Sequence, residues 1–329
     1  MDDPMNPPLH SCYRTLQPVL LAGLALLVGC SKQPLSPGQR MTARQALYAI
    51  IAPTEQELAS LETVAGSRYR GGPIEVQTAA GNRHRGGSVE FHNGIPFRHA
   101  TIAGRACVLL PCGMSVVNAA MVTQAALDRY PITHVIVMGE AGGVNPSRVP
   151  GDVIVPEAWS HHTEAAVVNP TAEGGWEVTR SASGIPNFGM IFPETVTVTR
   201  SGSRGAEPVP RFPVDPGLRM AATKAASLLS TTNSPSGPRF PTSGIGVSGP
   251  LFVANRDYRA WLFSAWRAEV VDLESAAIAQ VCWANRVPFI AVRSISGLAG
   301  EPPMKTPPGP SPIQRAAQLV TAMLEELPR

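Results

Sequence analysis

The chain has 329 residues, a length that fits one large domain or two ordinary ones. Hydrophobic residues make up 44% and charged residues 16%, which supplies enough apolar material for a core and excludes a disordered chain. Lys and Arg number 27 against 24 Asp and Glu, and a net charge of +3 is too small to indicate nucleic-acid binding. No apolar run reaches the roughly 18 residues of a transmembrane helix, so we expect none.

The N-terminal segment has the pattern of a bacterial lipoprotein signal. Residues 18–29 read PVLLAGLALLVG, an apolar run of signal-peptide length. Residues 27–30 read LVGC and resemble a lipobox, whose cysteine is acylated and becomes the first mature residue. We therefore expect a signal peptide over residues 1–29, a polar tether over 30–42 and a lipid anchor at Cys30 in the cell envelope, at the outer membrane facing the periplasm. The alternative is a short buried helix with a chance cysteine.

The rest of the chain alternates predicted strands and helices. Apolar runs predict strands at 46–52, 132–138, 151–155 and 288–294, two or three strands within 88–110, and an extended stretch at 248–253. Helical periodicity predicts helices at 54–64, 116–130, 218–229, 256–266, 274–285 and 312–327. Residues 169–245 are rich in Pro, Gly and Ser, which indicates surface insertions around one helix. This alternation predicts a three-layer α/β domain over residues 43–329 with both sheet faces covered.

Cysteines and histidines offer no metal or disulfide site. Cys107 and Cys112 lie five residues apart on or beside one predicted strand, about 17 Å when extended, which is beyond disulfide reach. With Cys282 they form an odd set, so we expect buried, inert thiols. His161 and His162 are adjacent on a predicted strand and point to opposite faces, which favours a polar edge or a subunit contact over a metal site.

The segments that follow predicted strands carry the candidate chemistry, because ligands of open α/β sheets bind at the carboxyl ends of strands. Glu57 lies in the first turn of a helix, and Thr54 precedes it as an N-cap in a capping-box pattern. The glycine-rich turn at 139–143 lets backbone amides approach a ligand closely. Phe252 is available to stack on a planar ring, and Glu274 at a helix start can accept hydroxyl hydrogen bonds. For each of these residues a purely structural role is the alternative.

Four motifs occur in order along the chain: IIAPTEQELASL at 50–61, GMSVVNAA at 113–120, GEAGGVNPSRVPGDVIVP at 139–156 and VVDLESAAIAQVCWANRVPFIAVRSISGLAG at 270–300. Together they resemble the nucleoside phosphorylase superfamily, and most nearly its methylthioadenosine/S-adenosylhomocysteine nucleosidases. The resemblance runs from about residue 46 to residue 327, apart from the insertions. It implies a mixed, mostly parallel sheet, cleavage of the bond between a ribose and a purine-type base without a cofactor, and a possible homo-oligomer.

The resemblance also implies roles for individual residues. Glu57 matches the glutamate that holds the attacking water, Glu274 the one that binds ribose hydroxyls, and Phe252 the ring that stacks on the base. Arg293, on the last strand, is expected to make a structural pairing below the site. Further substrate contacts are implied for Met114, Ser115, Gly142, Val253, Leu273 and Ser296.

Two departures from the family pattern bear on catalysis. Where the family has Ser-Asp, with the Asp protonating the base, this sequence has Ser296 and Gly297. Losing a general acid costs about 10² to 10⁴ in rate. Where the family has a small residue, this sequence has Glu140. One hypothesis is that Glu140 replaces the missing acid from the opposite wall, and the alternative is that the acid is lost and the chain only binds its ligand.

Several functions therefore remain open. The first is hydrolysis of a purine-type nucleoside by a lipid-anchored enzyme, and the second is a non-catalytic nucleoside or base receptor. A relative whose site has decayed is the third, and Glu57, Glu274 and Phe252 argue against it. Phosphorolysis is disfavoured because residues 52–55 contain no arginine to hold phosphate, and because Glu57 would repel a phosphate dianion.

Overall fold

The computed structural model describes residues 46–68, 75–77, 83–85, 89–177, 183–232, 239–305 and 308–328. All of them belong to one compact unit, Gln45–Arg329. The predicted signal peptide and the whole predicted tether, residues 30–42 with Cys30, precede this unit and lie outside the described residues. Within the described ranges, no helix combines the length and the apolar character needed to cross a membrane.

The centre of the unit is an 11-stranded mixed sheet. Its strands are β1 (Leu47–Ala52), β4 (Val89–His92), β5 (Ile95–Ile102), β6 (Arg105–Pro111), β7 (His134–Gly143), β8 (Val153–Ile154), β9 (Ala158–His161), β14 (Phe212–Pro213), β15 (Ile245–Ser248), β16 (Ala268–Asp272) and β17 (Phe289–Leu298). The order is β14-β9-β15-β16-β7-β1-β6-β5-β4, and β17 pairs with β7 and β8. β6, β1, β7 and β17 run parallel, while β16 meets the end of β7 in antiparallel register. The predicted mixed, mostly parallel sheet is confirmed.

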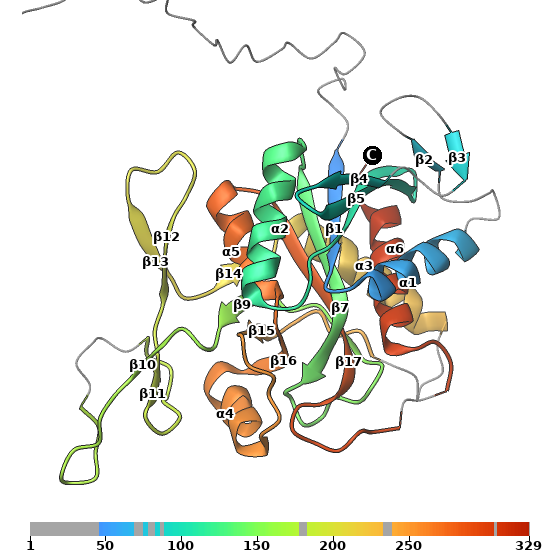
Figure 1. Ribbon diagram of the computed structural model, residues 1–329. Helices are drawn as coiled ribbons and strands as arrows, with labels where there is room; N and C mark the ends of the chain where they lie inside the picture. The colour runs from blue at the N-terminus through green and yellow to red at the C-terminus, as the bar shows by residue number, and fades with distance from the viewer. Residues whose placement is uncertain are drawn as a thin grey trace, which may run out of the picture. The chain divides into compact units, whose positions relative to one another are not determined.

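Helices cover both faces of the sheet (Figure 1). On one face α1 (Glu55–Arg68) and α3 (Pro216–Thr232) pack against α6 (Pro312–Glu326), which lies on β7 and β17. On the other face α2 (Val116–Arg129) packs against α5 (Ser275–Asn285), and α5 lies on β9 and β15. The remaining helix, α4 (Arg256–Trp266), packs against β16. This arrangement confirms the three-layer prediction.

Small two-stranded ribbons accompany the main sheet. The segment predicted as insertions, residues 169–245, contains most of two such ribbons together with β14, α3 and the start of β15. The ribbons are β10 (Ala165–Val167) with β11 (Ile191–Pro193), β12 (Val196–Thr199) with β13 (Ala206–Val209), and, near the N-terminus, β2 (Glu75–Gln77) with β3 (Arg83–Arg85). The β10–β11 and β12–β13 ribbons do not line the cavity described below.

Local sequence signals account for two of these elements. The turn between β4 and β5 has Asn93 at φ 50° and Gly94 at φ 78°, the left-handed pair that a tight hairpin requires. At the start of α1 the Thr54 hydroxyl accepts from the Glu57 amide at 3.2 Å, and the Glu57 carboxylate accepts from the Thr54 amide at 3.0 Å. This reciprocal pair is the predicted capping box. It fixes the direction in which α1 leaves β1.

The core confirms the expected state of three cysteines. Cys107, Cys112 and Cys282 are buried and free. Burial raises the pKa of the Cys107 thiol and that of the Cys112 thiol to about 12, because the apolar interior disfavours the thiolate. These thiols are therefore inert near neutral pH.

The structure differs from the sequence prediction at the ends of β7 and β15 and in the presence of β16. β7 continues past the expected end at residue 138 to Gly143, because its glycine-rich end pairs with both β16 and β17. β15 ends at Ser248, so the stretch expected to be extended to residue 253 is largely a loop. Sequence patterns did not mark β16, because its five residues AEVVD alternate too briefly to be distinguished from a loop.

Candidate active site

A cavity of about 820 Å³ lies at the carboxyl ends of β1, β7, β16 and β17. This is the edge where open α/β sheets bind ligands. The cavity is lined by all the predicted catalytic and substrate-contacting residues except Ser115: Glu57, Met114, Glu140, Gly142, Phe252, Val253, Leu273, Glu274 and Ser296. The backbone amide of Ser115 nevertheless donates to Glu274 Oε1 at 3.3 Å. Six separate segments of the chain thus meet at one site.

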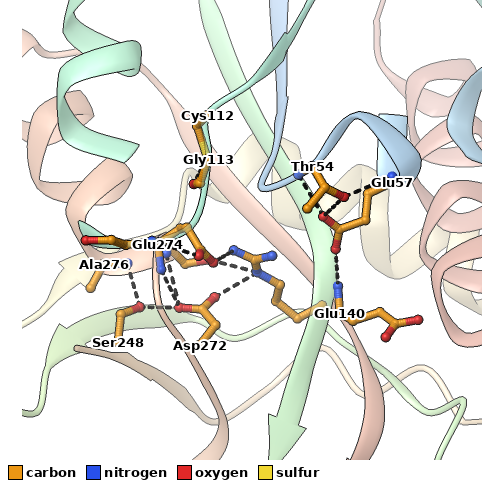
Figure 2. A network of polar contacts seen from close by, with 12 residues as sticks. Thr54, Glu57, Cys112, Gly113, Glu140, Ser248, Asp272, Glu274 and Ala276 are labelled. Atoms are coloured by element: carbon orange, nitrogen blue, oxygen red, sulfur yellow. Dashed lines mark hydrogen bonds and ion pairs between the residues drawn. The ribbon is translucent and has the colours of Figure 1, made fainter. Parts of the chain in front are cut away.

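Glu57 is held in place from two sides. Its Oε2 accepts hydrogen bonds from the Thr54 amide at 3.0 Å and the Thr54 hydroxyl at 2.9 Å. Its Oε1 accepts from the backbone amide of Glu140 on β7 at 3.0 Å (Figure 2). Because α1 and β7 both fix the carboxylate, its position does not depend on a mobile side-chain rotamer.

Glu274 occupies the opposite part of the site, at the N-cap of α5, and is only 3% exposed. Its Oε1 accepts from the Ser115 amide, and its Oε2 lies 3.2 Å from Nη2 of Arg293. Burial raises the pKa of Glu274 to about 7, although the positive charge of Arg293 acts in the opposite direction. A carboxylate in this position can accept hydrogen bonds from vicinal hydroxyls of a ligand.

A buried ionic network lies beneath the two glutamates. Nε of Arg293 is 2.7 Å from Oδ2 of Asp272, while Asp272 Oδ1 accepts from the Ser248 hydroxyl and from the amides of Glu274, at 3.2 Å, and Ser275, at 3.1 Å. Arg293 is fully buried, in keeping with the structural pairing expected of it. Asp272 and Ser248 were missed by the sequence reasoning, and the available signal was the acidic residue at the end of a strand two positions before Glu274.

Arg293 also faces the side of the site that holds Glu57. Its Nη1 is buried and has no hydrogen-bond partner among the described residues. A Cβ placed on Gly139 would overlap this Nη1 and would lie 2.9 Å from Glu57 Oε1. Glycine at position 139 therefore allows β7 to pass between the guanidinium and the carboxylate.

Phe252 and Gly297 lie in the part of the cavity where the resemblance expects the base. The Phe252 side chain is 87% exposed, so it is not packed into the core and its ring is available to a ligand. Gly297 pairs with Gly142 across the β7–β17 register, and a Cβ on Gly297 would have no atom within 4 Å. The missing side chain at position 297 thus leaves open space in the cavity.

The backbone and the carboxylate of Glu140 lie in different directions. The amide donates to Glu57, while Figure 2 shows the carboxylate directed away from Glu274 and Asp272. Burial, and secondarily the charge of Glu57, raise the pKa of Glu140, and a backbone hydrogen bond from Ile313 lowers it. A carboxyl group in this environment retains its proton to higher pH than usual, which is the property an acid catalyst needs.

The family model of the phosphorylase superfamily matches residues 48–325. The chain belongs to the phosphorylase superfamily. Among curated relatives, the 5′-methylthioadenosine/S-adenosylhomocysteine nucleosidase of Geobacillus kaustophilus is 30% identical over 210 residues, covering 63% of this chain and 74% of the relative. The nucleosidase of Tolumonas auensis is 29% identical over 208 residues, or 63% and 75%.

Solved structures of the superfamily agree with the fold. The nucleosidase of Colwellia psychrerythraea, in complex with adenine, superposes with a TM-score of 0.59 at 24% identity, covering 86% of this chain and 96% of that one. A futalosine hydrolase of Helicobacter pylori gives the same TM-score at 16% identity and covers 86% of this chain and 100% of the hydrolase. At these identities the likeness shows the fold alone.

The histidine pair lies at the end of β9, with His161 as the last residue of that strand. No group of three or more potential His, Cys, Asp or Glu ligands occurs among the described residues. His162 is buried, and its Nδ1 lies 2.9 Å from the Tyr258 hydroxyl. Burial lowers the pKa of His162 to about 4, so the ring is neutral at physiological pH. These contacts place His162 in the interior of the fold, where the sequence analysis expected a polar edge or a subunit contact.

Proposed function

We propose that the chain hydrolyses the N-ribosidic bond of a purine-type nucleoside. The observation that carries this proposal is that Glu57 and Glu274 line one cavity together with the exposed ring of Phe252. Carboxylates on two sides of a sugar and an aromatic face for the base are the groups such a reaction requires. The nucleosidase relatives of the chain support the same reaction class.

In this proposal Glu57 positions the attacking water and accepts its proton. The water oxygen forms a bond to C1′ of the ribose, and the electron pair of the C1′–N bond passes to the base. Glu274 accepts hydrogen bonds from the ribose hydroxyls and so fixes the sugar for attack. Glu140 donates a proton to the departing base, in the role that the absent carboxyl group at position 297 has in the family pattern.

Water is favoured over phosphate as the acceptor. Residues 52–55 after β1 contain no cation, and Glu57 would repel a phosphate dianion at that position. Among the residues that line the described cavity, Arg256 is the one Lys or Arg. It lies at the start of α4, in a different segment from the one that holds Glu57. Base release that depends on added phosphate would overturn this choice.

Base release by the full chain tests the function. Wild type is expected to release base from purine nucleosides, while Glu57→Gln and Glu274→Gln each lower the rate by about 10² or more, because each removes a charge at the reacting sugar. Glu62→Gln is the matched control, since Glu62 lies on the same helix as Glu57 and outside the cavity. Full activity of Glu57→Gln would contradict the assigned role.

The open space at Gly297 favours a second candidate, a non-catalytic nucleoside or base receptor. Calorimetric titration of the full chain with the same nucleosides separates the two functions. Binding without base release selects the receptor, whereas binding with release selects the hydrolase. If the chain neither binds nor cleaves these nucleosides, both functions are ruled out and only the fold assignment remains.

We also propose that the protein is anchored in the cell envelope by a lipid on Cys30. The support is the apolar run at 18–29 followed by LVGC. We expect a chain expressed in a bacterial host to begin at an acylated Cys30 and to fractionate with membranes, and Cys30→Ala to abolish the acylation. Mass spectrometry of the N-terminal peptide checks this, and an unmodified Cys30 preceded by residues 1–29 would contradict it.

A further inference from the structure

A cluster of two arginines and one glutamate borders the cavity at the start of α4. Arg256 Nη2 lies 3.0 Å from Glu301 Oε2, and Arg259 Nη2 lies 2.8 Å from Glu301 Oε1. Arg256 and Glu301 both line the cavity. The cluster as a whole carries two positive charges and one negative charge, and Arg259 is not among the residues that line the cavity.

The backbone holds the cluster together. Asn255 caps α4 by accepting the Tyr258 amide at 2.8 Å. The loop after β17 lies directly against this helix start, because a Cβ on Gly300 would come within 2.8 Å of the Asn255 carbonyl carbon and 3.0 Å of the Arg256 nitrogen. Gly300 also has a φ of +76°, which side chains rarely adopt. Glu301, the next residue, is thereby placed beside both arginines.

The two arginines differ in their availability to a ligand. The Arg259 side chain is 13% exposed and is held by Glu301, whereas the Arg256 side chain is 63% exposed and lines the cavity. Glu301 thus binds one arginine deep in the wall and leaves the donors of the other partly free. A guanidinium offers five N–H donors and no acceptor, so its complementary partner is an acceptor oxygen.

Arg256 belongs to the part of the cavity that holds the base under the proposed function. It follows Phe252 and Val253 by three to four residues, and Glu57 and Glu274 mark the sugar part. A base that presents an amino group toward Arg256 would place donor against donor. A base that presents an oxo oxygen there would gain a charge-assisted hydrogen bond.

We infer that Arg256 is a specificity-determining residue that selects a base with an oxo oxygen on the edge remote from the sugar, so that the preferred substrates are 6-oxopurine nucleosides. This inference rests on the proposed function, since it assumes that the base occupies this part of the cavity. It adds the substrate class, which the proposed function leaves open.

Equilibrium binding of free bases to the full chain tests the inference without requiring catalysis. Hypoxanthine and adenine are suitable probes because they are similar in size and differ chiefly in an oxo or amino group at position 6. By calorimetry, wild type is expected to bind hypoxanthine more tightly. Arg256→Met is expected to weaken hypoxanthine binding about tenfold and adenine binding less than about threefold, because it removes the charged donors and keeps the aliphatic stem.

Two further variants complete the experiment. Arg256→Lys retains the charge and is expected to preserve the preference for hypoxanthine, while Arg204→Met, at an exposed position outside the cavity, is expected to change neither affinity. Thermal unfolding confirms that each variant is folded. Equal binding of both bases, unchanged in Arg256→Met, would overturn the inference and leave the proposed function intact. If wild type binds neither base, both the inference and the proposed function are overturned.

Discussion

Two glutamates in the same cavity have different surroundings. Glu274 is buried beside Arg293, whereas Glu57 is half-buried at the N-terminus of α1 and accepts three hydrogen bonds. Two carboxylates in one cavity can perform different tasks when their surroundings differ in burial and in hydrogen-bond partners. The structure therefore separates the proposed water-positioning group from the proposed sugar-binding group by environment as well as by position.

The buried position of Glu274 predicts a pH-dependent stability. Because the folded-state pKa is raised to about 7 from an ordinary 4.5, the folded protein binds this proton more tightly than the unfolded chain does. The resulting stabilisation is complete below about pH 4.5 and is lost as pH rises through about 7. We expect the free energy of unfolding of wild type, relative to Glu274→Gln, to fall by about 3 kcal/mol over that interval.

Urea denaturation of both proteins at several pH values measures this difference. Glu62→Gln serves as the comparison for a partly exposed glutamate outside the cavity. A constant difference between wild type and Glu274→Gln from pH 4.5 to 7.5 would show that Glu274 does not carry a raised pKa.

The assignment of Glu140 as the acid predicts a loss and a rescue. In β7, Glu140 and Gly142 lie two residues apart and so share one face of the sheet, and Gly142 pairs with Gly297. We expect Glu140→Gln to lower base release by about 10² or more, because the base then leaves without a proton donor. Gly297→Asp in the same chain is expected to restore much of the rate, since a side chain at position 297 meets no neighbouring atom within 4 Å of its Cβ.

The control for this rescue is Gly297→Asn in the Glu140→Gln background, which adds the same volume without an acidic proton. Equal rates for the Asp and Asn variants would assign the rescue to shape and not to acid catalysis. Full activity of Glu140→Gln alone would show that Glu140 is not the acid.

The sequence predicted most of the cavity at the level of single residues, because its motifs are collinear with a known family. It did not identify Asp272, Ser248, Arg256 or Glu301. These residues interact through contacts between segments that are far apart in the chain. Ser248 and Asp272, for example, are separated by 24 positions. A pattern read along one segment contains no information on such pairings.

Helices were predicted more closely than strands. α4 coincides with the predicted range 256–266, and α6 begins at the predicted residue after a Ser311 capping box. Capping residues and periodicity are local signals, so they can be recognised in the sequence without knowledge of the tertiary structure. The end of β7 and the whole of β16 depend instead on pairing between strands, which sequence periodicity does not report.

For the whole molecule, composition and alternation of elements predicted the layered architecture. They also marked residues 169–245 as different from the rest, and the structure places most of the β10–β13 ribbons there. The strand content of those ribbons was not predicted, since strands of three or four residues in a Pro- and Gly-rich segment lack a measurable period. The lipid anchor at Cys30 remains a prediction from the sequence.

The course of β7 has a consequence for how this protein can diverge. One continuous strand passes Arg293 at Gly139, donates to Glu57 through the next residue and pairs with the ends of β16 and β17. Insertions and deletions in the outlying ribbons can therefore accumulate over generations without altering the spacing of the residues that line the cavity. A register slip of one residue in β7, by contrast, would reverse the faces of its side chains and misalign both walls of the cavity together.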